Sequence, residues 1–221
     1  MKEGILVVNK PVGLTSHDVV EKIRKKFGMR RVGHGGTLDP LATGVLIVLL
    51  GRATKLFNKI VNLNKAYRAT LILGTTTTSA DIHGKILEQK PYEHITRENV
   101  EGVFKKFLGD IQQVPPMVSA VKIGGKKLYK LARKGIEISR PARSIRIDSL
   151  KLEDFNKPHV KFFIECSRGT YVRQLAEDVG KVLGCGACIT QIERTCVGQF
   201  KIDESLRLED LNESHIQHWE G

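Results

Sequence analysis

The chain of 221 residues is poor in the features that mark exported and membrane proteins. Its four cysteines are expected to stay reduced, because nothing at the amino terminus resembles an export signal. The longest apolar run, Val45 to Leu50, is far too short to span a bilayer. Together these absences predict a cytoplasmic globular protein without disulfides and without a membrane anchor.

The cysteine pattern also gives little support to a metal or redox site. Cys185 and Cys188 have the CxxC spacing, but no second close pair accompanies them. Small buried thiols are common in protein cores, so the pair is interpreted as structural and no metal is expected. Internal repeats and low-complexity linkers are missing as well, which favours a single domain.

Acidic residues are fewer than basic ones, 24 against 36, and the formal net charge of +12 favours a polyanionic partner. The segment 122–146 holds nine basic residues and one acid, Glu137, and a second basic cluster lies between Lys22 and Arg31. The stretch from Lys201 onward is acidic, so phosphate contacts are expected upstream of it. The alternative is a generally basic, solvated surface.

Helical and strand-like segments follow one another without strict alternation. Ser16 is expected to cap a helix that begins at His17, and Thr96 to cap another. A third helix should bury Val172, Leu175, Val179 and Val182 on one face. This mixture predicts an α+β fold with a mixed, mainly antiparallel sheet flanked by helices. The simplest division is one catalytic domain, 1–221, with an inserted basic lobe near residues 112–146. The strand-like runs are residues 4–9, 45–50, 65–73, 144–152, 159–166 and 187–196.

The most informative segment is Gly33 to Gly44, GHGGTLDPLATG. Its glycines permit close backbone approach to a ligand, and Asp39 is its only carboxylate. A structural turn is the alternative, because aspartate before proline often initiates turns. The segment matches neither a phosphate loop nor a dinucleotide fingerprint. Spacing alone leaves both interpretations open.

Five segments stand out in order along the chain: NKPVGLTS at 9–16, the loop at 33–44, KAY at 65–67, VPPMVSAVK at 114–122 and SRGTYVR at 167–173. Together they resemble the motifs of the bacterial tRNA pseudouridine synthase B (TruB) family, and five ordered motifs form a specific signature. This resemblance implies the pseudouridine synthase catalytic fold and the isomerisation of uridine 55 in the T loop of tRNA, by base flipping and without a cofactor.

The resemblance also implies roles for individual residues. Asp39 would be the catalytic carboxylate, attacking base or sugar or removing a sugar proton. Arg173 would orient Asp39 and keep it ionised, unless it is only a surface helix arginine. Tyr67 would stack on the flipped uracil and accept the C5 proton, although strand tyrosines more often pack in cores. The substrate-binding residues would be His34, Tyr67, Tyr171, Ile192 and Lys10, with Lys10 supporting the motif loop.

The expected partner is the T stem-loop of tRNA, with no obligatory protein partner. Two alternatives stay open: an RNA-binding folding factor in which Asp39 is dispensable, and a guide-dependent synthase like the archaeal and eukaryotic relatives. The residues expected to contact RNA are Lys122, Lys126, Lys127, Lys130 and Arg133.

Three features depart from the family pattern. Ile192 stands where leucine is usual, which is a conservative change in an apolar wall. Cys188 replaces a histidine found in many members. Bacterial members usually continue into a small C-terminal RNA-binding domain, whereas this sequence stops at Gly221. We therefore expect a naturally short or truncated form without a separate C-terminal domain.

Overall fold

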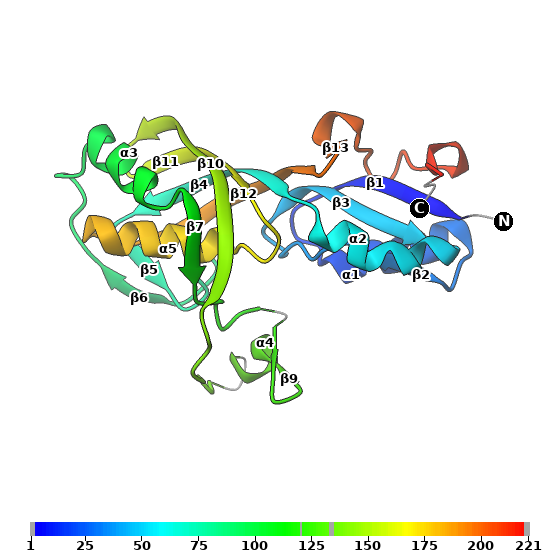
Figure 1. Ribbon diagram of the computed structural model, residues 1–221, viewed down its shortest axis with the longest axis horizontal. Coiled ribbons are helices and arrows are strands. Elements are labelled where there is room, and N and C mark those ends of the chain that lie inside the picture. Colours follow the sequence, from blue (N-terminus) through cyan, green and yellow to red (C-terminus); the bar gives the residue numbers. More distant parts are fainter. Residues whose placement is uncertain (1–2, 120, 133–134, 219–221) are drawn as a thin grey trace. The chain divides into compact units, whose positions relative to one another are not determined.

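The computed structural model describes residues 3–119, 121–132 and 135–218, and it describes side chains for all of these except positions 122, 126, 127, 129 and 130 (Figure 1). The chain forms two compact units. Unit 1 comprises residues 1–68 and 191–221, and unit 2 comprises residues 69–190. The predicted division into one domain with a lobe near 112–146 stays a prediction.

Unit 1 is built on three neighbouring strands in the order β1-β3-β12. The strand β1 runs antiparallel to β3 along its whole length, from Gly4 opposite Leu50 to Lys10 opposite Gly44. The strand β12 pairs with the start of β3 in parallel, and β2 pairs with its end in antiparallel. The elements of this unit are β1 Gly4–Lys10, α1 Ser16–Phe27, β2 Val32–His34, β3 Thr43–Leu50, η1 Gly51–Leu56, α2 Phe57–Asn62, β13 Phe200–Lys201, η2 Ile202–Glu204 and η3 Glu213–His215.

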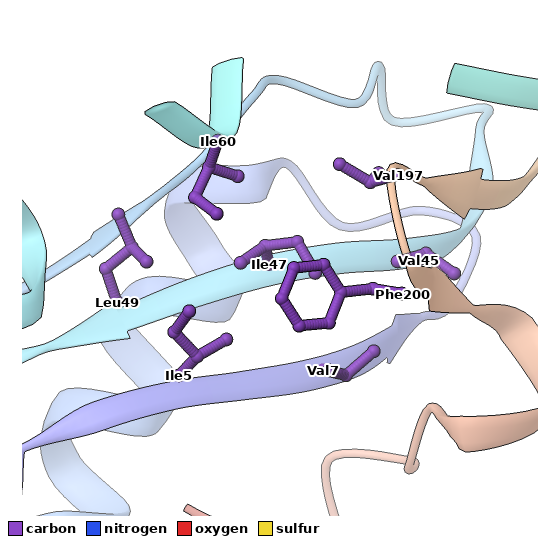
Figure 2. Packing of buried hydrophobic residues seen from close by; sticks show 8 residues of the cluster. All are labelled: Ile5, Val7, Val45, Ile47, Leu49, Ile60, Val197 and Phe200. Carbon is purple, nitrogen blue, oxygen red and sulfur yellow. The ribbon is translucent and has the colours of Figure 1, made fainter. Parts of the chain in front are cut away.

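One hydrophobic cluster of unit 1 lies on one face of β1 and β3. Alternate residues of these strands point to the same side, as the two-residue period of a strand requires (Figure 2). The residues of β3 between them are buried as well, which explains why Val45 to Leu50 is apolar without interruption. The cluster comprises Ile5, Val7, Val45, Ile47, Leu49, Ile60, Val197 and Phe200.

The helix α1 begins one residue earlier than the sequence predicted. Thr15 is the N-cap, since its hydroxyl accepts a hydrogen bond from the Asp18 amide, and the Asp18 carboxylate accepts one from the Thr15 amide. This reciprocal capping box satisfies two amides that the first turn leaves unpaired. The prediction that Ser16 caps the helix was therefore wrong, and its buried hydroxyl bonds elsewhere.

Unit 2 holds the strand order β12-β4-β11-β10-β7. The strand β10 pairs in antiparallel with β11 and with β7. Since β12 also pairs in parallel with β3, the predicted mixed, mainly antiparallel α+β sheet is confirmed. The strands β4 Lys65–Leu73 and β12 Ala187–Val197 contribute residues to both units, and the other elements are β5 Thr75–Thr77, β6 Ile86–Gln89, α3 Arg97–Lys106, β7 Gly109–Gln113, β8 Lys122–Ile123, β9 Lys126–Lys127, α4 Leu128–Ala132, β10 Arg143–Asn156, β11 His159–Cys166 and α5 Val172–Leu183.

The helices of unit 2 follow their predicted patterns closely. Thr96 caps α3 as predicted. On α5, Val172, Leu175 and Val179 are buried, but Val182 is 49% exposed near the helix end, so the predicted stripe is one residue too long. None of the helices in the described part of the chain is long and apolar enough to cross a membrane.

Gly33 within β2 and Gly35 directly after it offer a matched test of this packing. A Cβ at position 35 would lie 2.2 Å from Cγ2 of Ile60, whereas a Cβ at position 33 would meet only Cγ2 of Thr54 at 3.7 Å. We expect Gly35→Ala to lower the free energy of unfolding by about 1–3 kcal/mol through overpacking. Gly33→Ala is the control and should leave it nearly unchanged. Urea denaturation measures both, and equal stabilities would contradict the packing described here.

Candidate active site

Asp39 lies in unit 1, on an irregular segment between β2 and β3. The segment bonds to its neighbours through its backbone. The Gly35 amide donates to the carbonyl of Ile47 at 2.8 Å, and the Gly13 amide donates to that of Pro40 at 2.8 Å. Within the segment, the Ala42 amide donates to the Asp39 carbonyl at 3.0 Å. These contacts fix the backbone around a half-buried carboxylate.

Ser16 holds the residue immediately before Asp39. Its Oγ accepts a hydrogen bond from the Leu38 amide at 2.8 Å and donates to the Leu38 carbonyl at 3.1 Å. Ser16 is the first residue of α1 and is 2% exposed. The helix therefore anchors the carboxylate-bearing segment through a dry pair of hydrogen bonds.

Arg194 of β12 contacts the same segment from the interior of unit 1. Its guanidinium donates from Nε to the Val45 carbonyl at 2.7 Å. The other nitrogens donate to the carbonyls of Thr37 at 3.4 Å and Gly36 at 3.3 Å. Arg194 was not predicted as a site residue, although an arginine within an otherwise strand-like run was a signal available from the sequence.

Lys10, which ends β1, is a second buried cation in unit 1. Its Nζ donates to the carbonyls of Pro11 at 2.8 Å and Leu14 at 2.7 Å, within the NKPVGLTS motif. Burial lowers the pKa of Lys10 to about 8, while attraction by Asp39 opposes that shift. The ammonium thus holds the turn that precedes α1.

Other predicted residues of unit 1 lie on neighbouring elements. His34 ends β2, and burial is the main cause that lowers its pKa. It lines a pocket of 330 Å³ together with His17, Arg24 and Phe57. On β4 and β12, Tyr67 and Ile192 are each 9% exposed, and the stacking of Tyr67 on a base stays a prediction.

Arg173 and Tyr171 belong to unit 2, at the start of α5. Arg173 is 3% exposed and donates to the carbonyls of Ser79 at 2.6 Å and Val118 at 2.8 Å. Its Nη1 also lies 3.8 Å from the Asp81 carboxylate, a partner that the sequence analysis missed. Arg173 is therefore not a surface arginine, and its predicted pairing with Asp39 stays a prediction.

Tyr171 is fixed through its backbone by a buried amide side chain. The Tyr171 amide donates to Oε1 of Gln113 at 2.8 Å, and Nε2 of Gln113 donates to the Tyr171 carbonyl at 3.1 Å. The ring is half-buried. Because Gln113 ends β7, this strand sets the position at which α5 begins.

The residues predicted to contact RNA are described by their backbone alone or lie outside the described residues. Arg133 is not among the described residues, and only the backbone is described at positions 122, 126, 127 and 130. In that backbone, Lys122 pairs with Lys127 in a two-stranded hairpin that precedes α4. The proposed contribution of these lysines to RNA binding therefore stays a prediction.

The CxxC pair lies in the interior of unit 2. Burial raises the pKa of the Cys188 thiol to about 11 and also raises that of Cys185. A raised pKa keeps a thiol protonated, and a protonated thiol is a poor nucleophile and a poor metal ligand. Across the described ranges, no group of three or more histidine, cysteine or acidic side chains is placed to hold a metal ion.

The chain matches two known sequence families. A sequence family described as TruB family pseudouridylate synthase (N terminal domain) matches residues 24–172. The chain belongs to the TruB family. A second family, described as tRNA pseudouridylate synthase B C-terminal domain, matches residues 173–220, which begin within α5. Pseudouridylate synthases are isomerases, so this chain is an enzyme of that class.

Curated relatives and solved structures agree with this family. The tRNA pseudouridine synthase B of Clostridium tetani is 47% identical over 216 residues, which cover 98% of this chain and 75% of the relative. That of Mycobacterium tuberculosis H37Rv is 45% identical, covering 95% of this chain and 72% of the relative. A chain in a solved Cbf5-Nop10-Gar1 complex has 31% identity and a TM-score of 0.75, covering 95% of this chain. This chain spans about half the length of that one, 54%.

The lowered pKa of Lys10 predicts a pH dependence of stability. Its ordinary value is 10.5, so between pH 8 and 10.5 the folded state loses this proton before the unfolded state does. Unfolding then takes up a proton, and the contribution of Lys10 to stability rises with pH, by at most about 1.4 kcal/mol per pH unit. Lys10→Met should abolish that rise.

Urea denaturation from pH 7 to 10 measures how the free energy of unfolding changes with pH. Lys22→Met is the control, because Lys22 is an exposed lysine of α1. The difference in unfolding free energy between wild type and Lys10→Met should grow above pH 8. A difference that stays constant over this range would mean that Lys10 keeps its ordinary pKa.

Proposed function

We propose that this chain isomerises uridine to pseudouridine at position 55 in the T loop of tRNA, with Asp39 as the catalytic carboxylate. Membership of the TruB family supports the reaction, and the names of the two relatives, tRNA pseudouridine synthase B, support tRNA as the substrate. The position within tRNA rests on the five sequence motifs. A tRNA substrate also favours a cytoplasmic location.

The reaction explains why a single carboxylate can suffice. The C1′–N1 glycosidic bond breaks, the uracil turns while it is held, and a C1′–C5 bond forms. The C5 proton then leaves and N1 takes up a proton. Product and substrate are isomers, so the atoms balance without an oxidant, a reductant or a group donor. A carboxylate can take part by attacking the base or sugar, or by removing a sugar proton.

The observation that carries the proposal is the way in which the Asp39 segment is held. Ser16 bonds both backbone groups of Leu38, and Arg194 bonds carbonyls on either side of Asp39. A catalytic group gains most of its effect from a fixed orientation relative to the bond that breaks. An ordinary surface turn would need no such buried polar support.

Further residues receive proposed roles around this carboxylate. Arg173 would orient and charge-balance Asp39, and Tyr67 would stack on the flipped uracil and accept the C5 proton. Tyr171 and Ile192 would complete the wall of the base pocket. His34 would contact the RNA beside the flipped base. Lys10 would support the loop through the carbonyls that it bonds.

Replacing Asp39 tests the proposal directly. Asp39→Asn keeps the size of the side chain but removes the carboxylate, so turnover should be abolished while tRNA affinity stays nearly intact. Tritium release from uracil C5 measures turnover, and filter binding measures affinity. Asp203→Asn, an exposed carboxylate of the same unit, is the control and should keep full activity. Release near the wild-type rate by Asp39→Asn would refute the catalytic assignment.

The basic segment 122–146 is proposed to supply much of the RNA affinity. Each phosphate that it neutralises should lower log affinity by roughly 0.7–0.9 per unit of log salt concentration. We expect joint replacement of Lys126, Lys127 and Lys130 by glutamine to weaken tRNA binding and flatten that slope, with the single-turnover rate less affected.

The matched comparison replaces Lys22, Lys25 and Lys26 of α1 by glutamine. A salt titration with the same tRNA compares both triple variants with wild type. If the α1 variant flattens the slope and the other variant does not, the RNA docks on the α1 cluster instead.

A further inference from the structure

Arg194 is a buried cation with an unusual set of partners. It is 2% exposed and is among the largest fully buried side chains of the described residues. A guanidinium removed from water must place its N–H groups on acceptors, because an unpaired buried charge is strongly destabilising. Its described hydrogen bonds all go to backbone carbonyls, and all of these belong to the segment from Gly36 to Val45.

The bonded carbonyls lie on both sides of Asp39 in the sequence. Gly36 and Thr37 precede it, at 3.3 and 3.4 Å from the guanidinium, and Val45 follows it, at 2.7 Å. The rigid guanidinium plane presents several donors in a fixed geometry, which the single ammonium of a lysine does not reproduce. One side chain therefore ties together the two ends of the segment that carries the carboxylate.

The backbone of Arg194 contacts the same segment. Arg194 and Gly44 are partners in the parallel pairing of β12 and β3. Gly44 has a φ of +93°, and a Cβ there would lie 2.3 Å from the Arg194 carbonyl oxygen. Glycine thus permits β12 to approach the end of the segment closely, and that approach brings the guanidinium within reach of Gly36 and Thr37.

We propose that Arg194 is a positioning residue for the isomerisation: it fixes the backbone on both sides of Asp39 and so sets where that carboxylate lies. This inference rests on the proposed catalytic role of Asp39. Arg194 acts through the loop and not by touching the substrate. Its loss should therefore slow the chemical step without weakening the binding of tRNA.

The test compares Arg194→Met, which keeps the length of the stem and removes the guanidinium, with Arg194→Lys. Single-turnover rate with saturating enzyme, tRNA affinity and Tm are measured for each. A displaced catalytic group can cost on the order of 100-fold in rate, and we expect a loss of that size in Arg194→Met. Arg194→Lys can keep a single bond, so its rate should fall between Arg194→Met and wild type. Affinity for tRNA should be unchanged in both.

A control separates positioning from general stabilisation. Ile5→Ala opens a cavity in the core cluster of the same unit, where Ile5 pairs with Leu49, and removes none of the hydrogen-bonding partners of Arg194 (Figure 2). It should lower Tm while the rate of the folded enzyme stays at the wild-type level. All rates are measured well below the lowest Tm. If Arg194→Met reacts as fast as Ile5→Ala, Arg194 only stabilises the fold and the inference is wrong.

Three further outcomes are informative. If Arg194→Met does not fold, Arg194→Lys is compared with Ile5→Ala, and equal rates overturn the inference. If Asp39→Asn is inactive while both Arg194 variants react at the wild-type rate, the inference fails and the proposed function stands. If Asp39→Asn itself reacts normally, the proposed function fails, and with it the reason for positioning Asp39.

Discussion

The candidate site depends on hydrogen bonds between buried polar side chains and the backbone of one irregular segment. The segment from Gly35 to Ala42 has no helix or strand of its own to hold Asp39 in place. Ser16 and Arg194, both nearly without solvent contact, bond its backbone groups in place of water. Because unpaired polar groups in a dry interior are costly, these bonds define the segment's conformation closely. The sheet β1-β3-β12 and the helix α1 then serve to bring these two side chains together around it.

The elements that depend on local pattern could be predicted from the sequence. The runs 65–73 and 159–166 were predicted with the bounds of β4 and β11, because β-branched and aromatic residues bounded by turns specify strands locally. The N-cap Thr15 was missed because adjacent Thr15 and Ser16 can both cap, and only the Asp18 partner decides between them. The partners of Arg194 and Arg173 could not be predicted, since Arg194 and Val45 are 149 residues apart and Arg173 and Ser79 are 94 residues apart. Such contacts arise from the tertiary fold and cannot be predicted from the spacing of residues along the chain.

Two alternative functions were left open by the sequence: an RNA-binding folding factor and a guide-dependent synthase. A folding factor that only binds RNA would have no need for a carboxylate held so firmly, whereas a guide-dependent enzyme would need it equally. The structurally similar chain comes from a Cbf5-Nop10-Gar1 complex, and this chain spans about half its length. The curated relatives of bacterial origin are covered more fully, 75% in the case of Clostridium tetani.

The central claim is that this chain alone carries the residues needed to convert one uridine of tRNA. The most direct measurement incubates the purified chain with an unmodified tRNA transcript, without other RNA or protein, and maps pseudouridine by chemical labelling and primer extension. The account predicts one new pseudouridine, at uridine 55 of the T loop. A tRNA that remains unmodified, or one that is modified only after a guide RNA or partner protein is added, would contradict it.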